Sequence, residues 1–121
     1  IGQPAFEHIN NNHQGLYDFQ KTELDELVKQ INTLISKSAI IIEEKQFEQL
    51  DELIDGQQSL LKYIESVRKK QIKRIKKEGL STKNSLLYLN ILAETKNLAL
   101  YLINLAKAER DFINFNNSNS H

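Results

Sequence analysis

The stretch VRKKQIKRIKKEGLSTKNSLLYLNILAETKNLALYLINL, residues 67–105, decides the fold. It contains a basic helix end, a Gly-Leu-Ser signal that stops one helix and starts the next, and then the most apolar helical segment of the chain. Gly79 suits the left-handed residue that closes a helix, and Ser81 suits the cap of the next one. The stretch therefore predicts a helical hairpin, around which we expect the rest of the chain to pack.

Helix breakers are almost absent from the middle of the chain, since 121 residues contain one Pro, Pro4, and four Gly. We predict an all-α fold, an antiparallel up-down-up bundle of three long helices at about 16–44, 47–78 and 82–112. Short links force neighbouring helices to run in opposite directions. We place the first turn at 44–47, although no Gly or Pro marks it.

Apolar residues at spacings of three and four define the faces that we expect to be buried. The stripe of the first helix is Leu24, Leu27, Ile31, Leu34, Ser38 and Ile41, widened by Val28, Ile35 and Ile42. That of the second helix is Phe47, Leu50, Ile54, Leu61, Ile64, Val67, Ile72 and Ile75. The third helix carries Ile91, Thr95, Leu98, Leu102, Leu105, Glu109 and Phe112, beside a second stripe of Leu87, Leu92, Ala99 and Ala106. A helix that is apolar on two sides is expected at the centre of a bundle.

The two ends differ in composition from the helical domain, which we place at 16–113. Residues 1–15 are predicted to be a leader or linker, in which Pro4 favours a short N-terminal helix. Residues 114–121 are polar and of low complexity, which predicts a disordered tail. The absence of Met at position 1 indicates a piece excised from a longer protein.

Composition excludes several classes of protein. Cysteine is absent, so the chain has no disulfide framework and no thiolate nucleophile, which fits a cytoplasmic setting. The longest apolar runs, 39–42 and 98–103, fall far short of the roughly 20 residues that span a bilayer. We therefore expect the fragment itself to be soluble.

Charge is balanced overall but unevenly placed. Residues 1–66 hold 5 Lys/Arg and 12 Asp/Glu, whereas residues 67–121 hold 11 and 4. An antiparallel fold brings these halves side by side, so the asymmetry first indicates internal complementarity and only then a partner.

Catalytic signatures are missing, and we predict a protein that is not an enzyme and has no cofactor. The possible metal ligands are Glu7, His8 and His13 in the leader, and Asp51, Asp55 and Glu94 on the helices. His residues five apart do not share a helical face, and each Asp follows an apolar residue of the buried stripe, which favours solvated carboxylates. No metal site is predicted.

The basic run near the end of the second helix is the strongest local signal. It comprises Arg68, Lys69, Lys70, Lys73, Arg74, Lys76 and Lys77. Cations favour a helix C-terminus in any case, but only by a few tenths of a kcal/mol each. The run lacks the aromatic residues of a nucleic-acid groove, so we predict contact with an anionic surface, either lipid headgroups or phosphate, and no nucleic acid.

The segments FEQLDELIDGQQSLLKYIESVRKKQIKRI, KEGLST and NSLLYLNILAETKNLALYLINL together resemble a known family. They are similar to PhoU-like helical domains, in particular the C-terminal cytoplasmic tail of bacterial sodium/phosphate cotransporter family proteins. The similarity covers about 16–112. Acidic motifs bind metal clusters in that family, but Gln57, Leu61 and Leu98 stand here where its pattern carries acids, so no metal site is carried over.

The resemblance implies a cytoplasmic regulatory or interaction domain of a sodium-dependent phosphate transporter, at the cytoplasmic face of the bacterial inner membrane. Its partners would be the membrane domain of the same polypeptide and anionic lipid headgroups. The basic end should then lie beside residue 16, where the chain would leave the membrane. The alternative is a structural, self-associating bundle, such as a homodimer, that binds a partner helix. Gly56, Thr95 and Glu109 interrupt the apolar stripes and indicate a core that a partner could complete.

Overall fold

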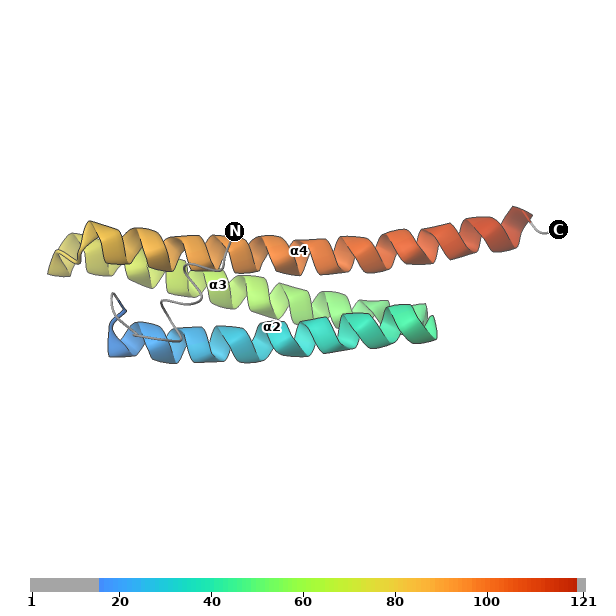
Figure 1. The fold of residues 1–121 in the computed structure, drawn as a ribbon, viewed down its shortest axis with the longest axis horizontal. Helices are drawn as coiled ribbons and strands as arrows, with labels where there is room; N and C mark the ends of the chain where they lie inside the picture. The colour runs from blue at the N-terminus through green and yellow to red at the C-terminus, as the bar shows by residue number, and fades with distance from the viewer. Residues whose placement is uncertain (1–15, 120–121) are drawn as a thin grey trace.

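The computed structural model describes residues 16–119, which form three long helices (Figure 1). They are α2 (Asp18–Glu44), α3 (Leu50–Glu78) and α4 (Thr82–Asn119), with a short 3-10 helix, η1 (Phe47–Gln49), before α3. The predicted leader helix and the last two residues of the predicted tail lie outside the described residues.

The three helices pack side by side with alternating direction, which confirms the predicted all-α three-helix bundle (Figure 1). At one end, the side chain of Gln20 near the start of α2 hydrogen bonds to Gln71 near the end of α3 and to Asn84 at the start of α4. Midway along, Gln57 of α3 donates to the backbone oxygen of Ala99 on α4 at 3.2 Å. The basic end of α3 therefore lies beside the start of α2, as predicted.

The two turns are closed in different ways. Gly79 has the predicted left-handed conformation (φ 60°), and the Asn84 N–H donates to the Ser81 hydroxyl at 3.3 Å, so the predicted cap is confirmed. The first turn lies where it was predicted, but a lysine, Lys45, adopts the left-handed conformation there (φ 56°). A non-glycine residue in this region costs about 1–2 kcal/mol, which a bundle can offset by packing.

The start of α2 is set by Gln20 in its first turn. The Tyr17 N–H donates to Gln20 Oε1 at 2.9 Å, which satisfies one of the backbone groups that a helix leaves unpaired at its start. Inside the same first turns, the Thr22 hydroxyl donates to the Asp18 carbonyl.

The buried face of α2 contains the predicted stripe from Leu24 to Ile41 and adds Gln20. It consists of Gln20, Leu24, Leu27, Ile31, Leu34, Ser38 and Ile41. Val28 and Ile35, predicted to widen it, are exposed, because both neighbours of α2 pack on the same stripe. The buried face of α3 is shifted by a residue at several positions, so that Leu53, Leu60 and Gln71 replace Ile54, Leu61 and Ile72.

The prediction for α4 is confirmed for its second stripe, of which Leu92, Ala99 and Ala106 are buried, and wrong for the main stripe at Leu98, Leu105 and Phe112, which are exposed. The buried residues of α4 are Asn84, Ser85, Tyr88, Leu92, Ala99, Ile103 and Ala106. In a three-helix bundle each helix turns one face to both neighbours, so the main stripe is covered only along its edge, where Ile91 and Leu102 pack against the core. Ala99 and Ala106 let the α4 backbone approach closely, whereas Leu98, Leu105 and Phe112 face outward.

Helix α4 also runs further than predicted, to Asn119 instead of about residue 112. No Gly or Pro interrupts residues 112–119, and each added residue of a formed helix contributes another backbone hydrogen bond. The predicted disorder is therefore wrong for 114–119, although the side chains of 114–117 are exposed, in keeping with their polar composition. Figure 1 shows α4 reaching well past the turn between α2 and α3.

Gly56 lies inside α3 and gives a direct test of the packing. A Cβ added there would meet only Leu34 Cδ1, at 3.6 Å, an ordinary contact. Ala is a better helix former than Gly by about 1 kcal/mol, so Gly56→Ala should raise the free energy of unfolding by about 0.5–1 kcal/mol. Urea denaturation followed by circular dichroism measures the change.

Gly79→Ala is the matched control, because the backbone of Gly79 is left-handed. This variant should lose about 1 kcal/mol of stability, since a Cβ is strained in that conformation. Loss of stability in Gly56→Ala would contradict the arrangement of α2 and α3 described here.

Candidate interaction surfaces

A cluster of buried amide side chains joins all three helices at the end where α2 begins. Gln20 and Asn84 form a reciprocal pair, with Gln20 Nε2 donating to Asn84 Oδ1 at 3.0 Å and Asn84 Nδ2 donating to Gln20 Oε1 at 2.8 Å. Gln20 Nε2 also donates to Gln71 Oε1 at 3.1 Å. Gln20 and Gln71 are completely buried. These hydrogen bonds between helices form only when α2, α3 and α4 are aligned in this register.

An ion pair lies one turn further along α2. Arg74 of α3 donates two hydrogen bonds to the Glu23 carboxylate, at 2.7 and 3.0 Å, and both side chains are largely buried. The hydroxyl of the fully buried Tyr88 donates to the same carboxylate from α4, and Tyr63 donates to the Glu23 carbonyl at 2.8 Å. The Arg74 guanidinium also lies 4.0 Å above the Phe19 ring. Each charged group in this site is paired within the bundle.

These contacts shift the ionisation of the groups involved. Burial alone would raise the pKa of Glu23, but hydrogen bonds from Arg74 and Tyr88 outweigh it, and the pKa lies below its ordinary value. Burial, together with the hydrogen bond to Glu23, raises the pKa of Tyr88 well above the ordinary tyrosine value. Burial and the nearby Glu23 charge also raise the pKa of Tyr63. Glu23 is therefore a stably charged acceptor, and neither tyrosine is prepared to act as a base.

The outward face of α3 carries a row of lysines. Its members are Lys62, Lys69, Lys70, Lys73, Lys76 and Lys77, all exposed. They lie on the side of α3 opposite the buried Leu60, Ile64 and Val67, because their spacings repeat with the turn of the helix. Within residues 16–119, none of these lysines forms a salt bridge. We call this set the lysine face.

Two of the seven predicted contact residues have other partners. Arg74 is held by Glu23, and Arg68 pairs with Glu65 on its own helix at 2.8 Å. The Glu23–Arg74 pair is the only salt bridge between helices in the described part of the chain. The acidic first half and the basic second half of the chain therefore attract each other mainly without direct ion pairs. Lys62 was not among the predicted contact residues, although it lies on the same side of the helix as Lys69 and Lys73 by periodicity.

The outward face of α4 carries a row of exposed apolar side chains. They are Leu98, Tyr101, Leu105, Ala108, Phe112 and Phe115, and we call them the α4 seam. Their spacings alternate between three and four residues. Such a row on a helix that already buries its opposite side is a surface suited to another helix.

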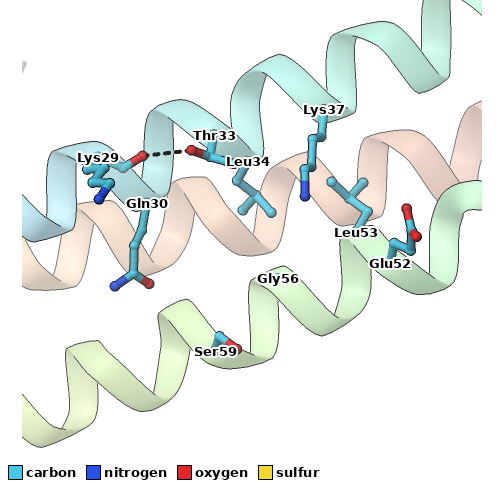
Figure 2. A pocket seen from close by; sticks show the side chains of 9 residues that line it. All are labelled: Lys29, Gln30, Thr33, Leu34, Lys37, Glu52, Leu53, Gly56 and Ser59. Atoms are coloured by element: carbon cyan, nitrogen blue, oxygen red, sulfur yellow. Dashed lines mark hydrogen bonds between the residues drawn. The ribbon is translucent and has the colours of Figure 1, made fainter.

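A shallow groove of about 200 Å³ lies between α2 and α3 (Figure 2). Leu34 points into it from α2, and on the α3 side Gly56 contributes no side chain. Small-molecule sites usually enclose about 300–1,000 Å³ and bury most of their ligand, which this open groove does not. We assign it no ligand.

The acidic residues that the sequence offered as possible metal ligands do not lie together. Asp51, Asp55 and Glu94 are all exposed. Among residues 16–119, no three His, Cys, Asp or Glu side chains lie close enough together to hold a metal ion. Glu7, His8 and His13 lie outside the described residues. In the same range, no helix has the length and apolar character needed to cross a membrane.

Comparison with known proteins identifies no relative. No family model matches the chain, and neither the curated proteins nor the solved structures contain a match.

Glu23 gives a pH-dependent test of the buried cluster. Because its pKa is lowered on folding, its stabilising effect is present above the ordinary Glu pKa of about 4.3 and is lost as pH falls through the lower folded value. Glu23→Gln should be less stable than the wild type at neutral pH, by roughly 1–3 kcal/mol, since Arg74 loses its partner. The difference should shrink as pH falls below about 4.3.

Urea denaturation at a series of pH values measures both effects. Glu26→Gln, an exposed change on the same helix, should leave the stability at neutral pH nearly unchanged. If the difference in stability between the wild type and Glu23→Gln stayed constant well below about pH 4.3, the Glu23 carboxylate would not be the partner that stabilises Arg74.

Proposed function

We propose that this chain is a non-catalytic interaction domain that rests on an anionic surface, the headgroups of acidic lipids, through the lysine face of α3. The observation that carries the proposal is the alignment of six exposed lysines, free of salt bridges to the described residues, along one side of a single helix. From Lys62 to Lys77 the row extends about 22 Å at 1.5 Å per residue. A straight row of this kind can place all of its charges against one flat surface.

The helix dipole explains only part of this row. Cations gain from the negative end of a helix within about its last turn, where only Lys76 and Lys77 lie. Lys62, Lys69 and Lys73 stand too far from that end to benefit. Each lysine close to an acidic membrane gains about 1 kcal/mol, which supports a surface-binding role for the whole row.

The position of the lysine face supports contact with a membrane from which the chain emerges. Residue 16 and the end of α3 lie at the same end of the bundle, joined by the Gln20–Gln71 and Glu23–Arg74 contacts. A membrane domain preceding α2 would therefore bring the cationic end of α3 toward the bilayer. The same end would then face the cytoplasmic leaflet, whose acidic lipids attract cations.

The wider part of the proposal is that the domain regulates or assembles a sodium-dependent phosphate transporter. It rests on the resemblance of residues 16–112 to PhoU-like cotransporter tails. Several apolar spans encoded upstream of Ile1 would support this part. A soluble domain encoded there would contradict the transporter role. The membrane-surface role would then depend on the vesicle-binding test alone.

Vesicle binding tests the lysine face. The chain should sediment with vesicles that contain acidic lipid and not with neutral vesicles, and added salt should weaken the binding. Changing Lys69, Lys73, Lys76 and Lys77 to Gln should lower the affinity by at least about tenfold. Arg74 is left intact in this variant because it holds Glu23 inside the bundle.

The control changes four exposed lysines elsewhere, Lys29, Lys37, Lys83 and Lys107, to Gln, so that the net charge falls equally. It should bind acidic vesicles nearly as well as the wild type. Equal losses in the two variants would show a dependence on net charge alone. That result would overturn the assignment to the lysine face.

A further inference from the structure

We propose that the α4 seam pairs two copies of this chain, in antiparallel orientation, as a short coiled coil. The seam belongs to neither the bundle core nor the lysine face. Leu98, Leu105 and Phe112 recur every seven residues, and Tyr101, Ala108 and Phe115 do the same three residues later. These are the two core positions of a heptad repeat. The exposed Glu94 stands at the next such position upstream and ends the apolar run.

The α4 seam runs from the part of α4 that packs in the bundle to the part that projects beyond it. The half containing Leu98 and Leu105 is backed by the bundle, since Ala99 and Ala106, which directly follow them, are completely buried on the opposite side. The half containing Phe112 and Phe115 lies beyond Ala106, the last fully buried residue of α4 within the described part. Figure 1 shows this part of α4 extending past the other helices. No other helix among residues 16–119 covers it.

The exposed area suits a reversible dimer. Tyr101, Phe112 and Phe115 are 60%, 61% and 64% exposed. Aromatic side chains bury about 150–250 Å² each, so the three rings can bury roughly 300–450 Å² per copy. When Leu98, Leu105 and the polar rim are added, the area buried by both copies together approaches the total of about 1,000 Å² that a specific interface needs.

The sizes of the side chains favour the antiparallel orientation. With a two-fold axis between Ala106 and Lys107, Leu98 faces Phe115, Tyr101 faces Phe112, and Leu105 faces Ala108 of the other copy. Each projecting end then lies on the part of α4 that the other bundle supports. A parallel pair would instead place Ala108 against Ala108 and leave a void, which is costly in a packed interface.

The flanks of the seam do not oppose this pairing. One flank carries Asn97, Asn104 and Asp111, and the antiparallel arrangement sets Asn104 opposite Asp111. Glu109 on the other flank falls opposite Leu102. No two like charges are brought face to face, so two copies can meet without electrostatic repulsion.

Sedimentation equilibrium of the full chain across a wide range of concentrations tests the dimer. The wild type should show a reversible monomer–dimer equilibrium. Phe112→Ser should weaken it by at least about tenfold, with unchanged helical circular dichroism. Leu86→Ser, at an exposed leucine of α4 outside the seam, should dimerise like the wild type. A wild type that is monomeric throughout, or a dimer that Phe112→Ser leaves intact, would overturn the proposal.

The absence of native cysteine allows the orientation to be tested by disulfide crosslinking. A mixture of Leu98→Cys and Phe115→Cys chains should form a mixed-chain disulfide under mild oxidation, whereas neither variant alone should crosslink efficiently. Efficient crosslinking of each variant with itself would show a parallel pair and contradict the arrangement. Both tests use no lipid, so their outcome is independent of the proposed membrane function.

Discussion

The bundle depends on a small set of buried polar groups that must meet at one end. Gln20, Gln71 and Asn84 come from three different helices, and Gln20 Nε2 has both of its partners only when all three helices are in register. A buried polar group without a partner costs about 1–3 kcal/mol, so a slip of any helix along its neighbours is penalised several times over. Leucine contacts alone would penalise such a slip less, because one apolar side chain can replace another.

The Glu23–Arg74 pair extends the same constraint to charge. A partly buried ion pair adds little net stability, but an unpaired charge left in its place is strongly unfavourable. Because Tyr88 donates to the same carboxylate from α4, the pair ties three helices rather than two. Hydrogen bonds and an ion pair therefore set the alignment of the helices at this end of the molecule. The opposite end is held by apolar packing, with Leu34, Ile41, Leu50 and Leu53 in the core.

Fixing this register decides which surfaces the molecule presents. It turns Leu60, Ile64 and Val67 of α3 inward and leaves the lysine face exposed on the other side. It also fixes α4 on its alanine-containing stripe, so the larger apolar residues of the α4 seam face solvent. Two different kinds of surface, one cationic and one apolar, thus result from a single alignment. They lie on different helices, so the proposed membrane contact and the proposed pairing of two copies do not compete for one surface.

The sequence by itself determined the number of long helices, the closure of α3 at Gly79, the cap at Ser81 and the central stripe of α2 from Leu24 to Ile41. These features depend on local conformational preference and on the period of a single helix, which are written in neighbouring residues. The apolar period also showed that α4 has two stripes, and the run of cations was visible directly.

Only the tertiary structure decided which stripe of α4 is buried, because both have the helical period and the choice depends on how closely Ala99 and Ala106 let the neighbours approach. It alone separated Arg74, held by Glu23, from the exposed lysines beside it. It also brought Gln20, Gln71 and Asn84 together, since no local pattern relates polar residues that lie far apart in the sequence and meet only after three helices have packed.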